Sequence, residues 1–129
     1  MSSIFTKIIN REIPAYIIDE NDDFIAFLDI NPVQKGHTLV VPKKEVDYIF
    51  DLDDYYLTKI LLYSKKIANA LKKTIPCNRI GISVTGLEVP HTHMHLIPIN
   101  SINDMYKGKI DLSKEEMIDI FNNIKKNLY

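Results

Sequence analysis

The chain has 129 residues, 46% of them hydrophobic, which is enough for one domain with a single buried core. Its 16 basic and 17 acidic residues give a net charge of -1, so the overall charge attracts neither a nucleic-acid backbone nor an anionic membrane. The single cysteine, Cys77, cannot form an internal disulfide, and residues 1–11 lack the unbroken apolar stretch of a signal peptide. We therefore expect one cytoplasmic domain, with no nucleic-acid or membrane partner.

The first half of the chain predicts one short helix and three strands. Apolar residues at helical spacing predict a helix over residues 3–10, with Ser3 as its cap. Short apolar runs at 16–19 and 24–29 flank a polar turn and predict an antiparallel hairpin. The β-branched run at 37–41, which ends before a proline, predicts a third strand.

The second half predicts two longer helices and two more strands. Apolar residues recur at helical spacing over 53–73, with acidic residues at its start and lysines at its end, as the helix dipole prefers. Strands are expected over 79–84 and 91–97, and a capped amphipathic helix over 113–128. Strands in the middle with segregated helices indicate the α+β class with an antiparallel sheet.

Three of the four histidines, His91, His93 and His95, alternate along one predicted strand, so their rings are expected to share one face. A metal site is one interpretation, but no carboxylate or second cysteine stands at ligand spacing. A structural cluster is another, although protonated rings repel and their desolvation is costly. The sharpest interpretation is a nucleophilic or acid–base site, because imidazole attacks phosphorus readily and its neighbours can hold phosphate oxygens.

The heptad His91-Thr92-His93-Met94-His95-Leu96-Ile97 resembles the signature of the histidine triad (HIT) family. Further blocks are similar, in order, to the nucleotide-binding phosphoramidase branch of that family, and they lie at residues 5–9, 13–15, 27–32, 35–43 and 88–90. The resemblance covers residues 3–98. It implies a five-stranded antiparallel sheet with a long helix and a C-terminal helix, in a single HIT-like domain over 1–129, with 100–129 as a C-terminal extension and helix.

The resemblance also implies roles for the histidines. His93, the middle one, would be the nucleophile that forms a nucleotidyl-histidine intermediate, which water then hydrolyses. His91 would hold the tautomer of His93 through the backbone and neighbouring residues. His95 would contact the phosphate, and His37, brought alongside from the third strand, would complete the catalytic cluster and assist proton transfer.

Carried over in the same way, Phe27, Leu28, Asp29 and Ile30 would form the nucleoside pocket, with Asp29 accepting hydrogen bonds from the ribose hydroxyls. On the phosphate side, Thr85, Glu88 and Val89 would also bind nucleotide, together with His95. The acidic Glu88 near a phosphate is expected to turn away or to contact a cationic leaving group.

Many bacterial relatives bind structural zinc through two N-terminal cysteines and histidines. The corresponding positions here look like Ser3 and Thr6, with Glu45 or Val46 where a histidine ligand is often found, so we expect no metal and no other cofactor. The resemblance further implies a homodimer, paired through the helix over 53–73 and the strand over 79–84.

The histidine triad with His37 and Asp29, through this resemblance, implies a purine nucleoside phosphoramidase-like hydrolase. It would release a nucleoside monophosphate, such as AMP, from a nucleoside phosphoramidate or a related mixed anhydride. Two alternatives stay open: a dinucleoside polyphosphate hydrolase, which differs in its leaving group, and a nucleotide-binding regulatory module in which catalysis is vestigial.

Overall fold

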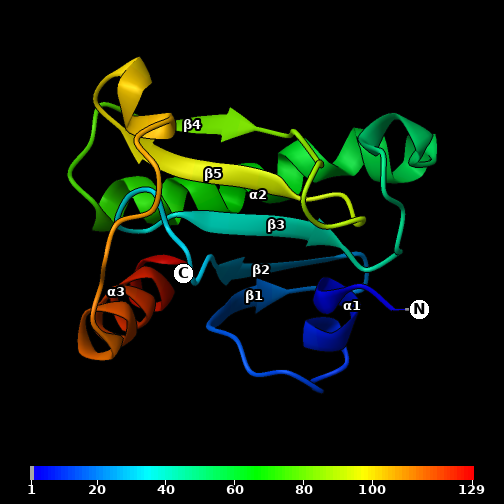
Figure 1. Cartoon of the computed structure of the whole chain (residues 1–129), viewed down its shortest axis with the longest axis horizontal. Helices are drawn as coiled ribbons and strands as arrows, with labels where there is room; N and C mark the ends of the chain where they lie inside the picture. The colour runs from blue at the N-terminus through cyan, green and yellow to red at the C-terminus, as the bar shows by residue number, and fades with distance from the viewer. Residues whose placement is uncertain (1) are drawn as a thin grey trace.

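The computed structural model describes residues 2–129, and in them a five-stranded sheet is flanked by helices (Figure 1). The helices are α1 (Ile4–Ile9), α2 (Asp54–Thr74) and α3 (Lys114–Asn127), with short 3₁₀ turns at Ile49–Asp51 (η1) and Ile102–Met105 (η2). The strands are β1 (Ile17–Glu20), β2 (Phe24–Leu28), β3 (Thr38–Pro42), β4 (Arg79–Ser83) and β5 (Met94–Ile99).

The strands lie in the order β1-β2-β3-β5-β4, and every neighbouring pair is antiparallel. The predicted α+β class with a five-stranded antiparallel sheet, a long helix and a C-terminal helix is therefore confirmed. Because β5 enters the sheet between β3 and β4, residues far apart in sequence meet at its centre, and β4 is left at an edge.

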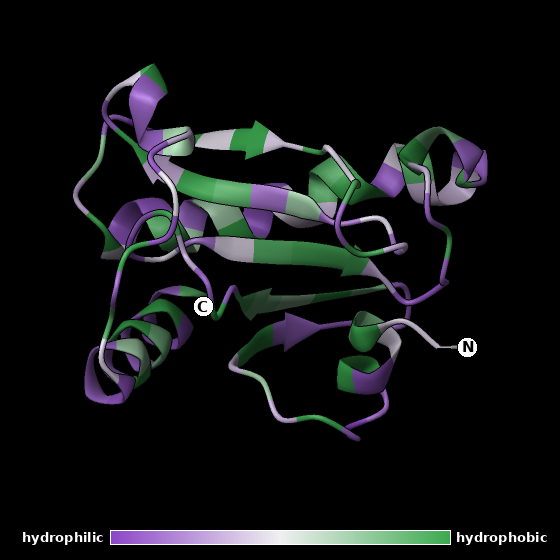
Figure 2. Ribbon diagram, viewed as in Figure 1, coloured by the Kyte–Doolittle hydropathy of each residue, from purple (hydrophilic) through white to green (hydrophobic). Residues whose placement is uncertain are grey.

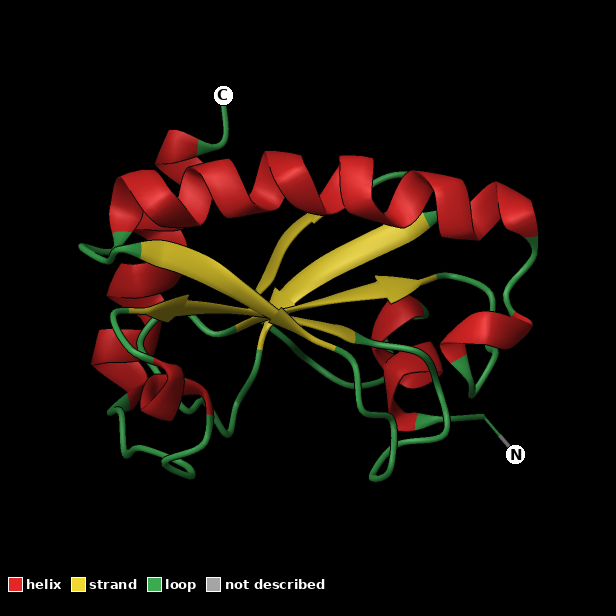
Figure 3. Ribbon diagram, turned by 90° about the horizontal axis from the view of Figure 1, so that it is seen from above, coloured by secondary structure: helices red, strands yellow, loops and turns green. Residues whose placement is uncertain are grey.

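Both faces of the sheet are covered, as the view from above shows (Figure 3). Helix α2 lies across one face, where Phe24, Val40 and Leu96 pack against Ile67 in the larger core. Helix α1 lies on the opposite face, in a smaller core built from Phe5, Ile8, Ile25, Phe27, Leu39 and Val41. This double coverage explains why every residue of β2 and β3 is buried and why, apart from Thr38, both strands are apolar and do not alternate (Figure 2).

The start of the last strand was predicted wrongly. The strand was expected over 91–97, but β5 begins only at Met94, where it pairs with Val40. In the same register Thr92 would face Pro42, which has no N–H to donate to the ladder. The Thr92 N–H bonds instead to the carbonyl of Val46, at 2.7 Å, so His91 and His93 precede the strand.

The chain after β5 packs onto the rest of the molecule. Turn η2 contacts β5, and α3 packs on α2 and β1, contributing Met117 and Ile124 to the larger core. Ser113 caps α3 through the predicted capping box with Glu116. None of the helices in residues 2–129 combines the length and apolar character required to cross a membrane.

Candidate active site

The α1 face of the sheet carries a row of side chains that crosses four strands. Phe27 of β2 pairs with Leu39 of β3, Leu39 pairs with His95 of β5, and His95 pairs with Ser83 of β4. Paired residues of neighbouring strands point to the same face, so this row changes from aromatic to aliphatic to polar across the sheet. His95 stands at the boundary between its apolar and polar halves.

Two cavities open on this face, one on each side of the histidines. The first has a volume of about 190 Å³ and is lined mainly by apolar residues of α1, the α1–β1 loop and β2, with Asp29 at its rim. The second, of about 220 Å³, is lined by ten residues: Val33, His37, Ser83, Thr85, Glu88, His93, His95, Ile97, Met105 and Tyr106. Glu88, His93 and His95 line both cavities, so a ligand filling both would cross the molecule at these three residues.

The ring of His93 is held in a defined tautomer. Its Nδ1 lies 2.8 Å from the carbonyl oxygen of His91, and because a carbonyl only accepts, Nδ1 must donate. In the neutral ring the lone pair is then on Nε2. Phe5 of α1 packs edge-on against the same ring, with centroids 5.0 Å apart, and His93 is only 5% exposed. The geometry therefore produces a nucleophilic nitrogen on a fixed ring.

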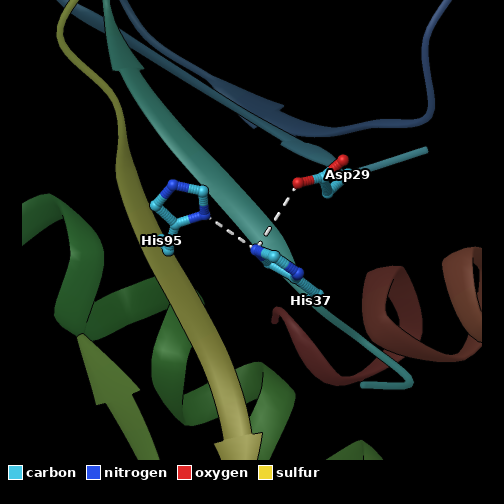
Figure 4. A group of neighbouring side chains, drawn as sticks. All are labelled: Asp29, His37 and His95. Carbon is cyan, nitrogen blue, oxygen red and sulfur yellow. Dashed lines mark hydrogen bonds and ion pairs between the residues drawn. The ribbon is translucent and has the colours of Figure 1, made fainter. Parts of the chain in front are cut away.

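Asp29, His37 and His95 form a second group, in which one hydrogen bond joins the two rings and the carboxylate of Asp29 lies close to His37 (Figure 4). The N–H of Val33 donates to Nδ1 of His37 at 3.0 Å, so neutral His37 carries its proton on Nε2. That Nε2 lies 2.9 Å from Nδ1 of His95 and 3.5 Å from Oδ2 of Asp29. His95 must then accept at Nδ1, and its own proton is on Nε2. The group forms a short chain along which protons can pass.

Burial keeps these histidines neutral. Desolvation lowers the pKa of His37 from 6.5 to about 4, against the opposing effect of the Asp29 carboxylate. Burial is also the largest cause of the lowered pKa of His91 and of His95, and His93 lowers the pKa of His95 further. Neutral His37, His91 and His95 at physiological pH keep the hydrogen bonds of these three rings as described.

Asp29, His37 and His95 also offer ligand atoms within 4.8 Å of one another, as a metal ion would require. A histidine that binds a metal presents a lone pair to the ion and donates a proton from its other nitrogen. His37 has the reverse arrangement, because its other nitrogen accepts from the N–H of Val33. The chemistry of this group therefore suits proton transfer better than ion binding.

The two cavities bring together nearly all the residues singled out in the sequence. Lining one or both cavities are Phe27, Leu28, Asp29, Ile30, Thr85, Glu88, Val89, His37, His93 and His95. His91 lines neither, because its fully buried ring bonds to Ser3 and to the carbonyl of Pro42. The expectation that all three triad rings present one strand face is corrected accordingly.

Some lining residues were missed. Phe5 and Ile8 of α1 belong to the wall of the first cavity. Their spacing in the sequence predicts the buried face of a helix, but it does not indicate a ligand-binding site. Met105 and Tyr106 reach the second cavity from η2, a 3₁₀ turn that leaves no periodic signal.

A family model described as the HIT domain matches residues 10–102. The chain belongs to the HIT family. It is 45% identical over 102 residues to an uncharacterized HIT-like protein of Borreliella burgdorferi, covering 74% of this chain and 73% of that one. It is also 38% identical over 96 residues to the adenosine 5'-monophosphoramidase HNT1 of Saccharomyces cerevisiae, covering 74% of this chain and 61% of that protein.

The solved structures agree with this assignment. A Hit-like protein of Bartonella henselae, described as involved in cell-cycle regulation, superposes with a TM-score of 0.84 at 33% identity, covering 98% of this chain and 96% of that one. Because the alignment spans nearly both chains, the resemblance to the HIT fold includes α3 and the turn before it. Membership of this family, with phosphoramidases among its relatives, supports a hydrolase of the HIT type.

Proposed function

We propose that this HIT protein hydrolyses nucleoside phosphoramidates or related mixed anhydrides through a nucleotidyl intermediate on His93. The observation that carries the proposal is the fixed ring of His93, with its lone pair on Nε2, at the junction of two cavities. The relative named as an adenosine 5'-monophosphoramidase supports AMP as the released nucleotide.

The apolar cavity is the proposed nucleoside site. Phe5, Ile8 and Phe27 offer apolar surface to a purine base, while Asp29 at the rim can accept hydrogen bonds from ribose hydroxyls. The Asp29 carboxylate is oriented before substrate arrives, because Oδ1 accepts the N–H of Asn31 at 2.8 Å. Such preorganisation reduces the entropy lost on binding.

In the proposed first step, the lone pair on Nε2 of His93 attacks phosphorus, and the bond from phosphorus to the leaving nitrogen breaks. The phosphoramidate nitrogen leaves in its protonated form as the amine, while Nε2–H of His95, held at Nδ1 by Nε2–H of His37, donates to a phosphate oxygen. In the second step water attacks phosphorus, the bond to Nε2 of His93 breaks, and the water proton that is released replaces the one the substrate nitrogen took up. The sum is one substrate and one water giving nucleoside monophosphate and amine.

The second cavity is the proposed site of the leaving group. Of the ten described residues that line it, none is lysine or arginine, and Glu88 is its one carboxylate. A polyphosphate leaving group would carry several negative charges past Glu88 without a cation to offset them. A neutral or cationic amine fits this lining better, which favours a phosphoramidate over a dinucleoside polyphosphate.

We also propose a symmetric dimer formed through α2 and β4. Ile82 on the edge strand is 52% exposed, and Leu61 and Leu62 on α2 are 57% and 72% exposed. An unpaired edge strand beside exposed leucines is costly in a monomer and would be covered by a second copy.

The test compares release of nucleoside monophosphate from adenosine phosphoramidate, adenylyl-lysine and diadenosine tetraphosphate. The proposal predicts that both phosphoramidates are cleaved faster than the tetraphosphate, and that His93→Gln abolishes cleavage. Glu88→Gln should slow the lysyl substrate selectively, because the carboxylate would no longer stabilise the lysine ammonium. Preferential cleavage of the tetraphosphate would instead identify a dinucleoside polyphosphate hydrolase, and nucleotide binding without cleavage would identify a binding module.

A further inference from the structure

The segment that contains His91 and His93 is held by a few backbone and side-chain hydrogen bonds outside the strand ladder. The β3–β5 ladder ends at the pair Val40 and Met94, so residues 91–93 lack the regular backbone pairing of the strand. Thr92 is tied to the carbonyl of Val46 by its N–H and its hydroxyl, both at 2.7 Å. The neighbouring His91, whose carbonyl orients His93, is held by its N–H, which donates to the carbonyl of Val89 at 2.8 Å, and by the contacts of its ring.

Both ring nitrogens of His91 are engaged. Nε2 lies 2.8 Å from the carbonyl oxygen of Pro42 and must donate to it. In the neutral ring Nδ1 then accepts, and its partner is the hydroxyl of Ser3 at 2.7 Å. The ring is 0% exposed, so no water can replace a lost partner at the ring surface without a rearrangement. Within residues 2–129, every buried side-chain nitrogen and oxygen has a hydrogen-bond partner.

Ser3 is itself oriented by Glu45, from the loop after β3. Oε1 of Glu45 accepts the Ser3 N–H at 2.6 Å and the Thr6 hydroxyl at 2.7 Å. These hydrogen bonds lower the pKa of Glu45 to about 2, with the Ser3 N–H as the largest cause, so the carboxylate stays ionised at physiological pH. Ser3 Oγ also accepts the N–H of Thr6 as the cap of α1, which leaves its proton for His91.

We propose that Ser3 and Glu45 are positioning residues for the nucleophile, acting through the ring and the carbonyl of His91. The chain of contacts runs from Glu45 to Ser3, from Ser3 to the His91 ring, and from the His91 carbonyl to Nδ1–H of His93. It rests on the proposed function only in taking His93 as the nucleophile.

The same contacts hold α1 against the site. A helix of six residues is too short to be stable alone, yet its Phe5 touches the rings of both His91 and His93. Ser3 and Glu45 therefore fix one wall of the nucleoside cavity and the nucleophile together. Their loss should affect the rate of attack more than the affinity for nucleotide, because the apolar contacts of α1 remain.

The test variant is Ser3→Ala combined with Thr6→Val, so that the Thr6 hydroxyl, 3.4 Å from Nδ1 of His91, cannot replace that of Ser3. The matched control is Ser113→Ala, which removes the equivalent cap from α3, away from both cavities. Ser3→Thr is the conservative variant, because it keeps a hydroxyl, and Glu45→Ala removes the carboxylate alone.

The first readout is the ¹⁵N spectrum of the imidazole rings, which reports tautomers without any need for activity. Wild type should show His91 protonated on Nε2 and His93 protonated on Nδ1, and the double variant should show a mixture of tautomers at His93. The second readout is the single-turnover rate of attack, expected to fall about tenfold or more in the double variant, since misplacing a reacting group by about 1 Å costs up to about a hundredfold.

Nucleotide affinity should change less than about threefold in the double variant, which is less than the expected loss of rate. Glu45→Ala should slow the attack less than the double variant does, and Ser3→Thr and the Ser113→Ala control should keep the wild-type rate and tautomers. An unchanged His93 tautomer in the folded double variant, or an equal loss of rate in Ser113→Ala, would overturn the positioning role. If the spectra change as described but wild type has no hydrolytic activity, the positioning stands and the proposed function fails.

Discussion

Acidification should destabilise the protein through His37. Its side chain is only 3% exposed, and burial lowers its pKa from 6.5 to about 4. Since the pKa in the folded state is below that in the unfolded state, the unfolded chain binds a proton first as the pH falls. The contribution to stability is complete above pH 6.5 and is lost progressively down to the folded pKa. A shift of 6.5 − 4 = 2.5 units corresponds to at most about 3 kcal/mol, and to about 2 kcal/mol between about pH 7.5 and about pH 5.

The assay is urea unfolding of wild type and His37→Asn across this pH range. Asparagine is the appropriate replacement because its Oδ1 can accept the Val33 N–H in place of Nδ1, while it does not titrate. The wild type should lose about 2 kcal/mol more than the variant on going from about pH 7.5 to about pH 5. The low pKa of Glu45 acts mainly below pH 4.5 and is common to both proteins. Parallel losses in the two proteins would refute a His37 pKa lowered by burial.

Three further predictions concern the core, the sheet edge and the nucleoside cavity. Ile67→Ala removes a fully buried side chain of α2 and should lower the free energy of unfolding by about 2–5 kcal/mol in urea denaturation. Ile82→Lys should convert the proposed dimer to a folded monomer in sedimentation velocity, and a persisting dimer would contradict the assigned surface. Asp29→Ala should weaken AMP binding about tenfold or more in calorimetry, through loss of charged hydrogen bonds worth about 1.5–3 kcal/mol.

Periodicity was sufficient for the main elements of the fold. The apolar spacing over 53–73 and 113–128 predicted α2 and α3 within about one residue at each end, a margin that helix ends usually show. The apolar run at 24–29 and the β-branched run at 37–41 indicated β2 and β3, both of which are buried on both faces. The spacing of apolar residues follows from which positions are buried, so it can be read from each segment of the sequence alone.

The start of β5 could not be read in the same way. Polar and apolar residues alternate from His91 onward as they would in a strand, but strand pairing depends on the partner, and Pro42 ends the available ladder. The effect of Pro42 on the opposite strand depends on the strand order, in which β5 lies beside β3, and strand order is a tertiary property.

For the site, the sequence predicts the catalytic residue types but not the contacts that hold them. Alternating histidines indicated catalytic chemistry, whereas the contacts that fix each ring come from distant parts of the chain. Ser3 is 88 residues from His91, and His37 is 58 residues from His95. The tautomers of His93 and His37 follow from a carbonyl and a backbone N–H, which have no residue-type signal in the sequence.

Covalent catalysis by His93 is tested most directly by intact mass measurement. Wild type and His93→Ala would be mixed with adenosine phosphoramidate and quenched rapidly in base, where a phosphorus–nitrogen bond to histidine survives. We predict that wild type gains the mass of one adenylyl group, which maps to His93, and that the variant gains none. Release of AMP without any adduct at the shortest times, or an adduct of equal yield on His93→Ala, would contradict the role assigned to His93.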